Sequence, residues 1–427
     1  MKFDIKNTKK MKNYLLALLL VASALPAAAQ NVNIPDANFK AYLVGNTNIN
    51  TTNDGEITVA EATAYTGVMS CNLKGNITDL TGIEAFTEIT ILNCGTLTST
   101  RLSSLDVSMN TKLTHLECKG HFSPTLDVTK NTKLESLHCS GNKLTSLDVS
   151  KNVLLKKLSV LTNLITSLDL SNNIDLTELY CNSNQIASLN ISKCTKLTKL
   201  ETQINKLRSL DVSVHPKLFT LHCASNTISS LDVSNCPLLY SLQIQNLQFT
   251  AIDLSKNIVL EKFACGGNKI KKIDVSKNPR LTELNCYNNA LTQLNAANGN
   301  NKKIIDFKAH QNPDLKCIQV DSTVWSTTNW TRIDPGAGFN EDCKYVNTSS
   351  VKEHSIANGK VYPNPASDYL TIALDVPFKE VTIYSINGVK VLQEQKSTFS
   401  VAHLNRGLYI ARIATENGII TKRFAKR

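Results

Sequence analysis

The sequence lacks the short motifs that mark several common enzyme classes. It contains no HExxH, no GxSxG and no phosphate-binding loop, the signatures of zinc peptidases, serine hydrolases and nucleotide-binding folds. After Ala24 it also lacks any run of about 18 unbroken apolar residues, the length that a membrane-spanning helix needs. These absences predict a protein that is not an enzyme and has no transmembrane segment in its mature chain.

A broad positive field is missing as well, although the formal net charge is +11. Of this charge, +4 lies in residues 1–29 and +5 in residues 345–427, which leaves +2 for residues 30–344. A nucleic-acid partner needs a basic surface that attracts phosphate groups. We therefore expect no nucleic acid among the partners of this chain.

Positions 1–29 have the layout of a secretory signal peptide. Lys9, Lys10 and Lys12 precede an apolar run from Tyr14 to Ala24, and three alanines follow at positions 27–29. A basic start, a short apolar stretch and small residues before the cleavage point are the elements of such a peptide. We expect cleavage near Ala29 and export of the remaining chain.

The body of the chain is a tandem array of one 21-residue unit. Residues 134–144 read LESLHCSGNKL, and the unit continues through a Leu-Asp-Val-Ser marker at positions 147–150. The marker returns at a constant spacing, ten times in all, with its first residue at Leu105, Leu126, Leu147, Leu168, Leu189, Leu210, Leu231, Ile252, Ile273 and Leu294. A fixed period of this kind indicates stacked coils, each of which buries its apolar side chains against its neighbours.

The pattern LxxLxLxxNxL in each unit resembles that of leucine-rich repeats, with cysteine in place of the third leucine. The resemblance implies a mainly β solenoid over residues 80–314. Because 21 residues leave little room for a helix on the back, we expect a strand at Leu-x-Cys on the front of each coil and a short extended or tight-turn segment at the marker behind. Two asparagine columns, represented by Asn142 and Asn152, are expected to satisfy backbone groups in the turns.

Twelve cysteines in an exported chain could form disulfides. Six occupy the third leucine position of the repeat pattern, which we call the cysteine slot. In other units Val160, Thr202, Ile244 and Phe307 fill this slot, so we expect it to be a buried apolar position. These six are Cys118, Cys139, Cys181, Cys223, Cys265 and Cys286. Cys317 and Cys343, beyond the repeats, are better disulfide candidates, and Cys71 with Cys94 is a weaker second pair.

Residues 30–79 depart from the repeat and predict a small helical N-terminal cap. Short helices at 36–44 and 59–65 flank a loop whose spacing resembles an EF-hand calcium loop. The ligands in that resemblance are Asn50, Thr52, Asp54, Glu56 through its carbonyl, and Glu61. Two interpretations stay open: the loop binds Ca2+, or the segment simply covers the end of the solenoid. At the other end, residues 315–344 predict a C-terminal cap closed by Trp325 and Trp330, followed by a linker at 345–355.

Residues 356–427 change character and contain no cysteine. Alternating runs at 369–374, 381–386 and 408–413, with turn sequences Asn387-Gly388 and Asn417-Gly418, predict a small Ig-like antiparallel β-sandwich. The order VYPNPA at 361–366, VTIY at 381–384, LNRGLYI at 404–410 and a basic end at 422–427 resembles the type A sorting domain of the type IX secretion system. The repeats and caps likewise resemble the leucine-rich-repeat surface proteins of Bacteroidetes. The resemblance implies the type IX secretion machinery as a partner, export through the periplasm, and release or attachment to the outer cell surface.

The outward residues of the predicted front strands vary from unit to unit. Their middle column reads Glu117, His138, Ser159, Tyr180, Glu201, His222, Gln243, Ala264, Asn285 and Asp306. A repeat scaffold presents a specific surface in this way. We predict that a protein or glycan ligand binds a concave face that contains His138, Tyr180, Glu201, His222, Gln243, Asn285 and Tyr287. The alternative is a structural or adhesive envelope component, in which a calcium-stiffened rod acts as a spacer.

A catalytic role for the histidines of this column is not indicated. His138 and His222 each precede a cysteine, but successive residues of a strand point to opposite faces, so neither pair can act as base and nucleophile. Glu201 and His222 lie on neighbouring units, and a contact between them could raise the pKa of the histidine.

Overall fold

The computed structural model describes residues 30–71, 76–95, 102, 104–121, 123–344, 360–374, 377–385, 390–415 and 418–427. The expected signal peptide, the expected linker and the turns at Asn387-Gly388 and Asn417 lie outside these residues. Contacts divide the chain into two compact units with a boundary between Cys343 and Lys344. None of the described helices combines the length and the apolar character that crossing a membrane requires.

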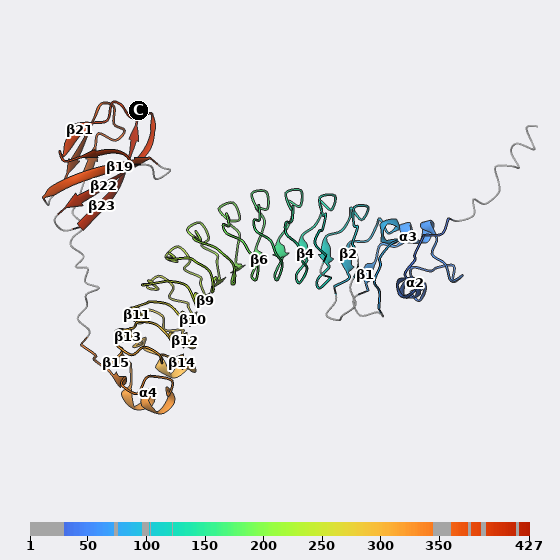
Figure 1. The fold of residues 1–427 in the computed structure, drawn as a ribbon, viewed down its shortest axis with the longest axis horizontal. Helices are drawn as coiled ribbons and strands as arrows, with labels where there is room; N and C mark the ends of the chain where they lie inside the picture. Colours follow the sequence, from blue (N-terminus) through green and yellow to red (C-terminus); the bar gives the residue numbers. More distant parts are fainter. Residues whose placement is uncertain are drawn as a thin grey trace, which may run out of the picture. The chain divides into compact units, whose positions relative to one another are not determined.

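The first unit is a parallel β-solenoid, as the constant repeat period predicts. Its front strands form a 12-stranded parallel sheet in which sequence neighbours pair in order. In Figure 1 these strands lie along the inner side of the curved solenoid. The strands are β1 Val68–Ser70, β2 Ile91–Asn93, β3 His115–Glu117, β4 Ser136–His138, β5 Lys157–Ser159, β6 Glu178–Tyr180, β7 Lys199–Glu201, β8 Thr220–His222, β9 Ser241–Gln243, β10 Lys262–Ala264, β12 Glu283–Asn285 and β14 Asp306–Lys308.

The back of the solenoid follows from the Leu-Asp-Val-Ser marker. The aspartate accepts a hydrogen bond from the backbone N–H two residues later, as Asp148 does from Ser150 at 2.8 Å, which closes a tight turn. Among the described coils, only the C-terminal ones add a second parallel sheet, on the outer side in Figure 1. Its strands are β11 Lys272–Asp274, β13 Gln293–Asn295, β15 Cys317–Gln319 and β16 Gly338–Asn340.

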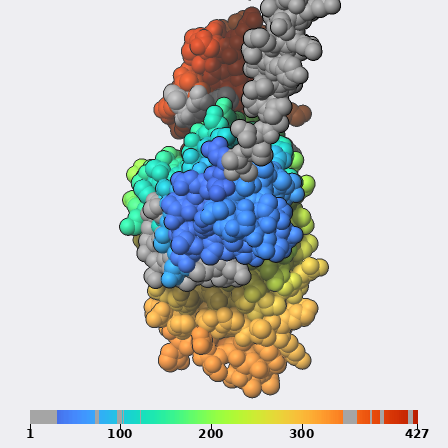
Figure 2. Space-filling model, turned by 90° about the vertical axis from the view of Figure 1, so that its right-hand side faces the viewer, coloured from blue at the N-terminus to red at the C-terminus, as the bar shows by residue number. Residues whose placement is uncertain are grey.

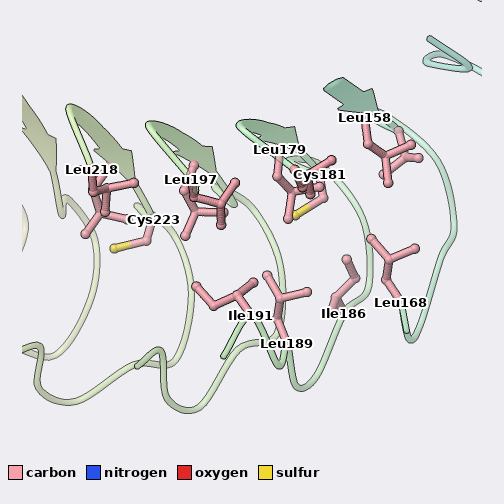
Figure 3. Packing of buried hydrophobic residues seen from close by; sticks show 14 of the residues in the cluster. Leu158, Leu168, Leu179, Cys181, Ile186, Leu189, Ile191, Leu197, Leu218 and Cys223 are labelled. Atoms are coloured by element: carbon pink, nitrogen blue, oxygen red, sulfur yellow. The ribbon is translucent and has the colours of Figure 1, made fainter. Parts of the chain in front are cut away.

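The inward side chains of successive coils form one continuous core. In the unit at 134–144, Leu134, Leu137, Cys139 and Leu144 are all fully buried. Figure 3 shows the same arrangement farther along, where Leu179 and Cys181 below a strand face aliphatic side chains from the back of the coil. Since each coil depends on its neighbours for this burial, the stack is stabilised as a whole.

Asparagines connect the coils at two positions, as expected. Asn184 accepts a hydrogen bond from the Ile165 N–H at 3.0 Å and donates to the carbonyls of Val160 at 2.9 Å and Cys181 at 3.1 Å. In the second column, Asn152 donates to the carbonyls of Val128 and Asn131, both at 2.9 Å. Buried backbone groups of adjacent coils are thereby satisfied.

Three consecutive coils replace the second asparagine with Cys194, His215 and Cys236, which sequence reasoning missed. All three are fully buried. Each bonds a carbonyl of the preceding coil: Cys194 that of Leu170 at 3.8 Å, His215 that of Ile191 at 3.2 Å, and Cys236 that of Val212 at 3.7 Å. One such bond replaces two from an asparagine, so the backbone is held less strongly here. Burial lowers the pKa of His215.

The N-terminal end is closed by two short helices, α2 Ala37–Val44 and α3 Val59–Ala64, and a 3-10 turn, η1 Ile83–Ala85. Asp36 caps α2 by accepting the N–H groups of Asn38 and Phe39, both at 2.9 Å. Phe39 and Leu43 are buried in the solenoid core. Figure 2 shows this segment as a blue layer in front of the coils.

The C-terminal end is closed by α4 Thr323–Asn329 and the residues around it. The ring of Trp330 stacks on Phe307 with centroids 4.0 Å apart, and its Nε1 donates to the Ile304 carbonyl at 3.0 Å. The expected disulfide between Cys317 and Cys343 is present, with a Cα–Cα distance of 5.8 Å. Trp330 is almost fully buried, so an aromatic side chain covers the last coil as expected.

The weaker disulfide candidate is wrong. Cys71 and Cys94 are free, buried thiols. Each donates to a carbonyl of the following coil, that of Asn93 at 3.7 Å and that of Glu117 at 3.5 Å. Neighbouring parallel strands direct their side chains the same way, so the two thiols lie side by side in the cysteine slot and do not face each other.

The register expected for the last coil is also wrong. Phe307 pairs with Leu284, so it occupies the strand centre and not the cysteine slot, which passes to Ala309. Asp306 accordingly pairs with Glu283, and Lys308 takes the position beside Asn285. The step from Leu284 to Phe307 is longer by two positions than the regular step before it, and the 3-10 turn η2 Asn301–Lys303 lies within it.

The second unit is the antiparallel sandwich that the sequence predicts. A three-stranded sheet has the order β17-β18-β21 and a four-stranded sheet the order β20-β19-β22-β23. Leu370, Val381, Ile383 and Phe424 are among the residues that form a core of their own between the sheets. The strands are β17 Lys360–Tyr362, β18 Tyr369–Ala373, β19 Phe378–Ser385, β20 Lys390–Glu394, β21 Thr398–Ser400, β22 Gly407–Thr415 and β23 Gly418–Lys426.

Candidate ligand-binding face

The concave face consists of the outward side chains of the front strands from β3 to β14. We define it as the first and third residue of each strand and the residue two positions after the third. The middle residue of each strand points into the core, as Leu200, Leu221 and Leu242 do. The alternation follows from the pleat of a β-strand.

Four of the predicted ligand-binding residues lie on consecutive strands. Tyr180, Glu201, His222 and Gln243 are direct partners in the parallel register of β6, β7, β8 and β9. The other three are on the same face but apart from this group. His138 is separated from Tyr180 by Ser159, Asn285 from Gln243 by Ala264, and Tyr287 follows Asn285.

Charged side chains surround Tyr180. Its hydroxyl donates to Glu178 at 2.7 Å, and Glu178 also pairs with Lys157 at 3.1 Å. The ammonium group of Lys199 lies 4.9 Å from the ring centroid and pairs with Glu201 at 3.2 Å. Burial raises the pKa of Glu178, but the hydrogen bonds from Tyr180 and Lys157 outweigh it and hold that pKa below its ordinary value.

The predicted site set omits Lys157, Glu178 and Lys199, although these three do most to fix the position of Tyr180. The signal was present in the column two residues before the variable one, where charge alternates as Lys, Glu, Lys on β5, β6 and β7. Side chains at such diagonal positions are within reach of each other.

His222 is a neutral hydrogen-bonding group. Its Nε2 lies 2.9 Å from the Ser241 hydroxyl, and its Nδ1 lies 3.9 Å from Glu201. Burial lowers the pKa of His222 by more than Glu201 raises it. Glu201 does raise this pKa, as expected, but burial and the nearby Lys199 lower it, so the net pKa lies below its ordinary value. Burial also raises the pKa of the adjacent Cys223 thiol to about 12, so this thiol is not a nucleophile at neutral pH.

At the C-terminal end of the face, Asn285 donates to Asp306 at 3.2 Å, and Asp306 pairs with Lys308 at 2.7 Å. Tyr287 stacks on His310 with ring centroids 5.5 Å apart. Its ring also lies against Gly266, where a Cβ would stand 2.6 Å from a ring carbon. Glycine at this position lets the tyrosine lie flat on the neighbouring coil.

The residues of the calcium-like loop are bonded among themselves. Glu61 accepts hydrogen bonds from the N–H and hydroxyl groups of Thr52 at one oxygen and of Thr58 at the other, all at 2.9 Å. Asp54 accepts from the Glu56 N–H at 2.9 Å, and the Glu56 carboxylate pairs with Lys40 at 2.6 Å. Burial raises the pKa of Glu61, but these hydrogen bonds outweigh it and lower that pKa to about 2.

In this arrangement both oxygens of Glu61 already have hydrogen-bond donors, which a bound cation would have to displace. Asn50 is buried and donates to the Val44 carbonyl. Within the described part of the chain, no three His, Cys, Asp or Glu side chains come together as a metal-binding group. Calcium binding therefore stays a prediction, and the loop has a sufficient account as a cap.

Comparison with known proteins bears on both units. Residues 360–427 match the family model for a secretion system C-terminal sorting domain. The functional domain of InlJ from Listeria monocytogenes, which includes a cysteine ladder, is 22% identical with a TM-score of 0.52, over 94% of this chain and all of that one. An internalin, InlF, from Listeria monocytogenes is 20% identical with a TM-score of 0.53, over 73% of this chain and 98% of that one. No curated protein matches the sequence.

The likeness to the internalins shows the fold of the first unit, and the family model shows the nature of the second. The chain has the fold of leucine-rich-repeat proteins and carries a C-terminal sorting domain of the type IX secretion system, which directs its export to the cell surface or the medium.

Proposed function

We propose that this protein is a non-enzymatic recognition protein that binds a protein ligand through its concave face. One observation carries the proposal. From β6 to β9 the inward residues are Leu179, Leu200, Leu221 and Leu242, whereas the outward column changes from tyrosine to glutamate, histidine and glutamine. A scaffold that keeps its core and varies its face presents a surface of its own.

The test is a binding screen of the full chain against purified extracellular-matrix proteins and arrayed glycans. A triple variant, Tyr180→Ala, Glu201→Lys and His222→Ala, is expected to lose the protein binding that the unmodified chain shows. The matched control is Lys193→Glu, an exposed charge reversal away from the concave face in the same coil as Tyr180. Thermal melting of each variant verifies that it is folded.

Three outcomes are distinct. Protein binding that survives the triple variant contradicts recognition by this face. Binding of glycans alone, lost in the triple variant, keeps the face but overturns the protein as ligand. The spacer hypothesis predicts that the triple variant and the control behave alike in every arm of the screen.

A further inference from the structure

The charges of the concave face neutralise one another. Among the described residues of this face, as defined above, five are lysines and five are carboxylates. Each lysine pairs with one carboxylate of the same face. The pairs are Lys119 with Glu117 at 2.6 Å, Lys157 with Glu178 at 3.1 Å, Lys199 with Glu201 at 3.2 Å, Lys262 with Glu283 at 2.6 Å, and Lys308 with Asp306 at 2.7 Å.

A charged ligand gains little from such a face. To bind a carboxylate or an ammonium group, the face would have to release one member of an existing pair and leave the other unpaired. An overall neutral surface also provides no long-range attraction that steers a charged partner. A ligand without charge meets neither obstacle.

Strands β8 and β9 form an uncharged window between two of these pairs. Lys199 and Glu201 lie on the strand before it, and the Lys262–Glu283 pair lies on the two strands after it. Thr220 and Ser241 are only 8% and 5% exposed, so the accessible groups of the window belong to its other outward residues. Its outward residues are Thr220, His222, Ala224, Ser241, Gln243 and Gln245.

The groups in this window are neutral donors and acceptors. The amide of Gln243 and the imidazole of His222 can each donate and accept. The side-chain oxygen of Gln245 has no hydrogen-bond partner, although it is buried. Two rungs of a parallel sheet span about 10 Å, room for a short extended peptide to present its own amide groups.

The aromatic rings of the face favour a peptide over a sugar. Lys157 and Lys199 lie over Tyr180, at 5.6 and 4.9 Å from the ring centroid. Tyr287 is packed against Gly266 and His310. Both tyrosine rings of the described face thus already have cationic or stacking neighbours, with which a sugar ring would have to compete.

We propose that the concave face recognises an uncharged, hydrogen-bonding peptide segment, seated on β8 and β9. This inference rests on the proposed function, because it names the ligand class of the same face. The ion pairs act as the borders of the site, and the ligand leaves them intact.

The test uses the full chain and three displayed peptide libraries of equal length: one uncharged and polar, one enriched in acidic residues and one enriched in basic residues. The expected result is selection from the uncharged library, with affinity that does not change between low and high salt. Gln243→Lys should lower the affinity of the selected peptides by about tenfold or more, because it leaves an unpaired charge against an uncharged segment.

Asn235→Lys is the matched control and should bind like the unmodified chain. It adds the same charge in the coil of His222, at an exposed position that is lysine in five other coils: Lys130, Lys151, Lys193, Lys256 and Lys277. If Gln243→Lys fails to fold, Gln245→Lys replaces it in the same assay.

If the unmodified chain selects peptides from an acidic or basic library and Gln243→Lys does not bind them, the ligand is charged. This result would overturn the proposal of an uncharged ligand but would support recognition by the concave face. If the unmodified chain binds neutral oligosaccharides on an array and Gln243→Lys loses that binding, the proposal that the ligand is a peptide is overturned. Selected peptides that bind both variants equally, or no selection from any library or array, would overturn the proposed function as well.

Discussion

Replacement of Asn184 with alanine should destabilise the solenoid far more than the same change two residues earlier. The Asn184 side chain is 9% exposed and makes hydrogen bonds to Ile165, Val160 and Cys181. Its loss leaves the Ile165 N–H buried without a partner, whereas the Val160 and Cys181 carbonyls keep donors from Asn163 and Asn205. The unsatisfied N–H costs about 1–3 kcal/mol, and each of the two other lost hydrogen bonds costs about 0.5–1.5 kcal/mol. We therefore expect a loss of roughly 2–5 kcal/mol in the free energy of unfolding.

The matched control is Asn182→Ala in the same coil. Asn182 lies on the concave face, and its side-chain oxygen has no hydrogen-bond partner. We expect this change to alter the free energy of unfolding by no more than about 0.5 kcal/mol. The two variants remove the same atoms, so the difference between them reports the hydrogen bonds of Asn184.

The assay is urea unfolding of the full chain, monitored by both circular dichroism and tryptophan fluorescence. Both tryptophans of the chain, Trp325 and Trp330, lie in the C-terminal cap, so fluorescence reports that end while circular dichroism reports all coils. Because coils are stabilised by their neighbours, Asn184→Ala should make the two transitions diverge. Equal midpoints for Asn184→Ala and Asn182→Ala would refute the stabilising role of the asparagine column.

The remaining predictions concern the caps, the thiols and the sorting domain. The pKa of Glu61 is lowered from 4.5 to about 2 in the folded chain, so the ionised carboxylate stabilises the fold above pH 4.5 and this contribution is lost as pH falls toward 2. The Glu61→Gln variant should therefore be less stable than the unmodified chain at neutral pH. Its melting midpoint should also depend less on acid pH. If the loop binds Ca2+, a chelator lowers the melting midpoint of the full chain, and an unchanged midpoint removes the metal. Ten cysteines are free and buried, so a thiol reagent should find almost none reactive in the native protein and ten after denaturation without reductant; early reaction of several would contradict their burial. Deletion of residues 360–427 should leave the protein in the periplasm, and normal secretion of the deleted form would contradict the role of the sorting domain.

The strand positions and the core could be predicted because both depend on local periodicity. Residues such as Leu137 and Cys139 recur at a fixed spacing, and burial of one copy implies burial of all. The same spacing indicated the asparagine columns. It failed at Phe307, because a longer step breaks the period there and no local signal marks where the additional residues lie.

The sequence was sufficient to locate the concave face but not to predict which of its side chains contact each other. Sequence alignment of the units places Tyr180 beside Glu201 and Glu201 beside His222, since parallel neighbours share a register. Whether Lys199 turns toward Tyr180 or toward solvent depends on side-chain rotamers across coils, which no periodicity encodes. The shared register allowed the contact between Glu201 and His222 to be anticipated. The lowered pKa of His222 could not be anticipated, because burial in the assembled face causes it.

The sequence by itself determined the repeat length, the inward residues, the order of the strands and the presence of the sorting domain, because each is carried by spacing along the chain. Tertiary structure alone decided that Cys71 and Cys94 stay free thiols, that Glu61 is bonded by Thr52 and Thr58, and that the lysines and carboxylates of the concave face pair one to one. These features depend on distances between side chains that only stacking the coils brings together.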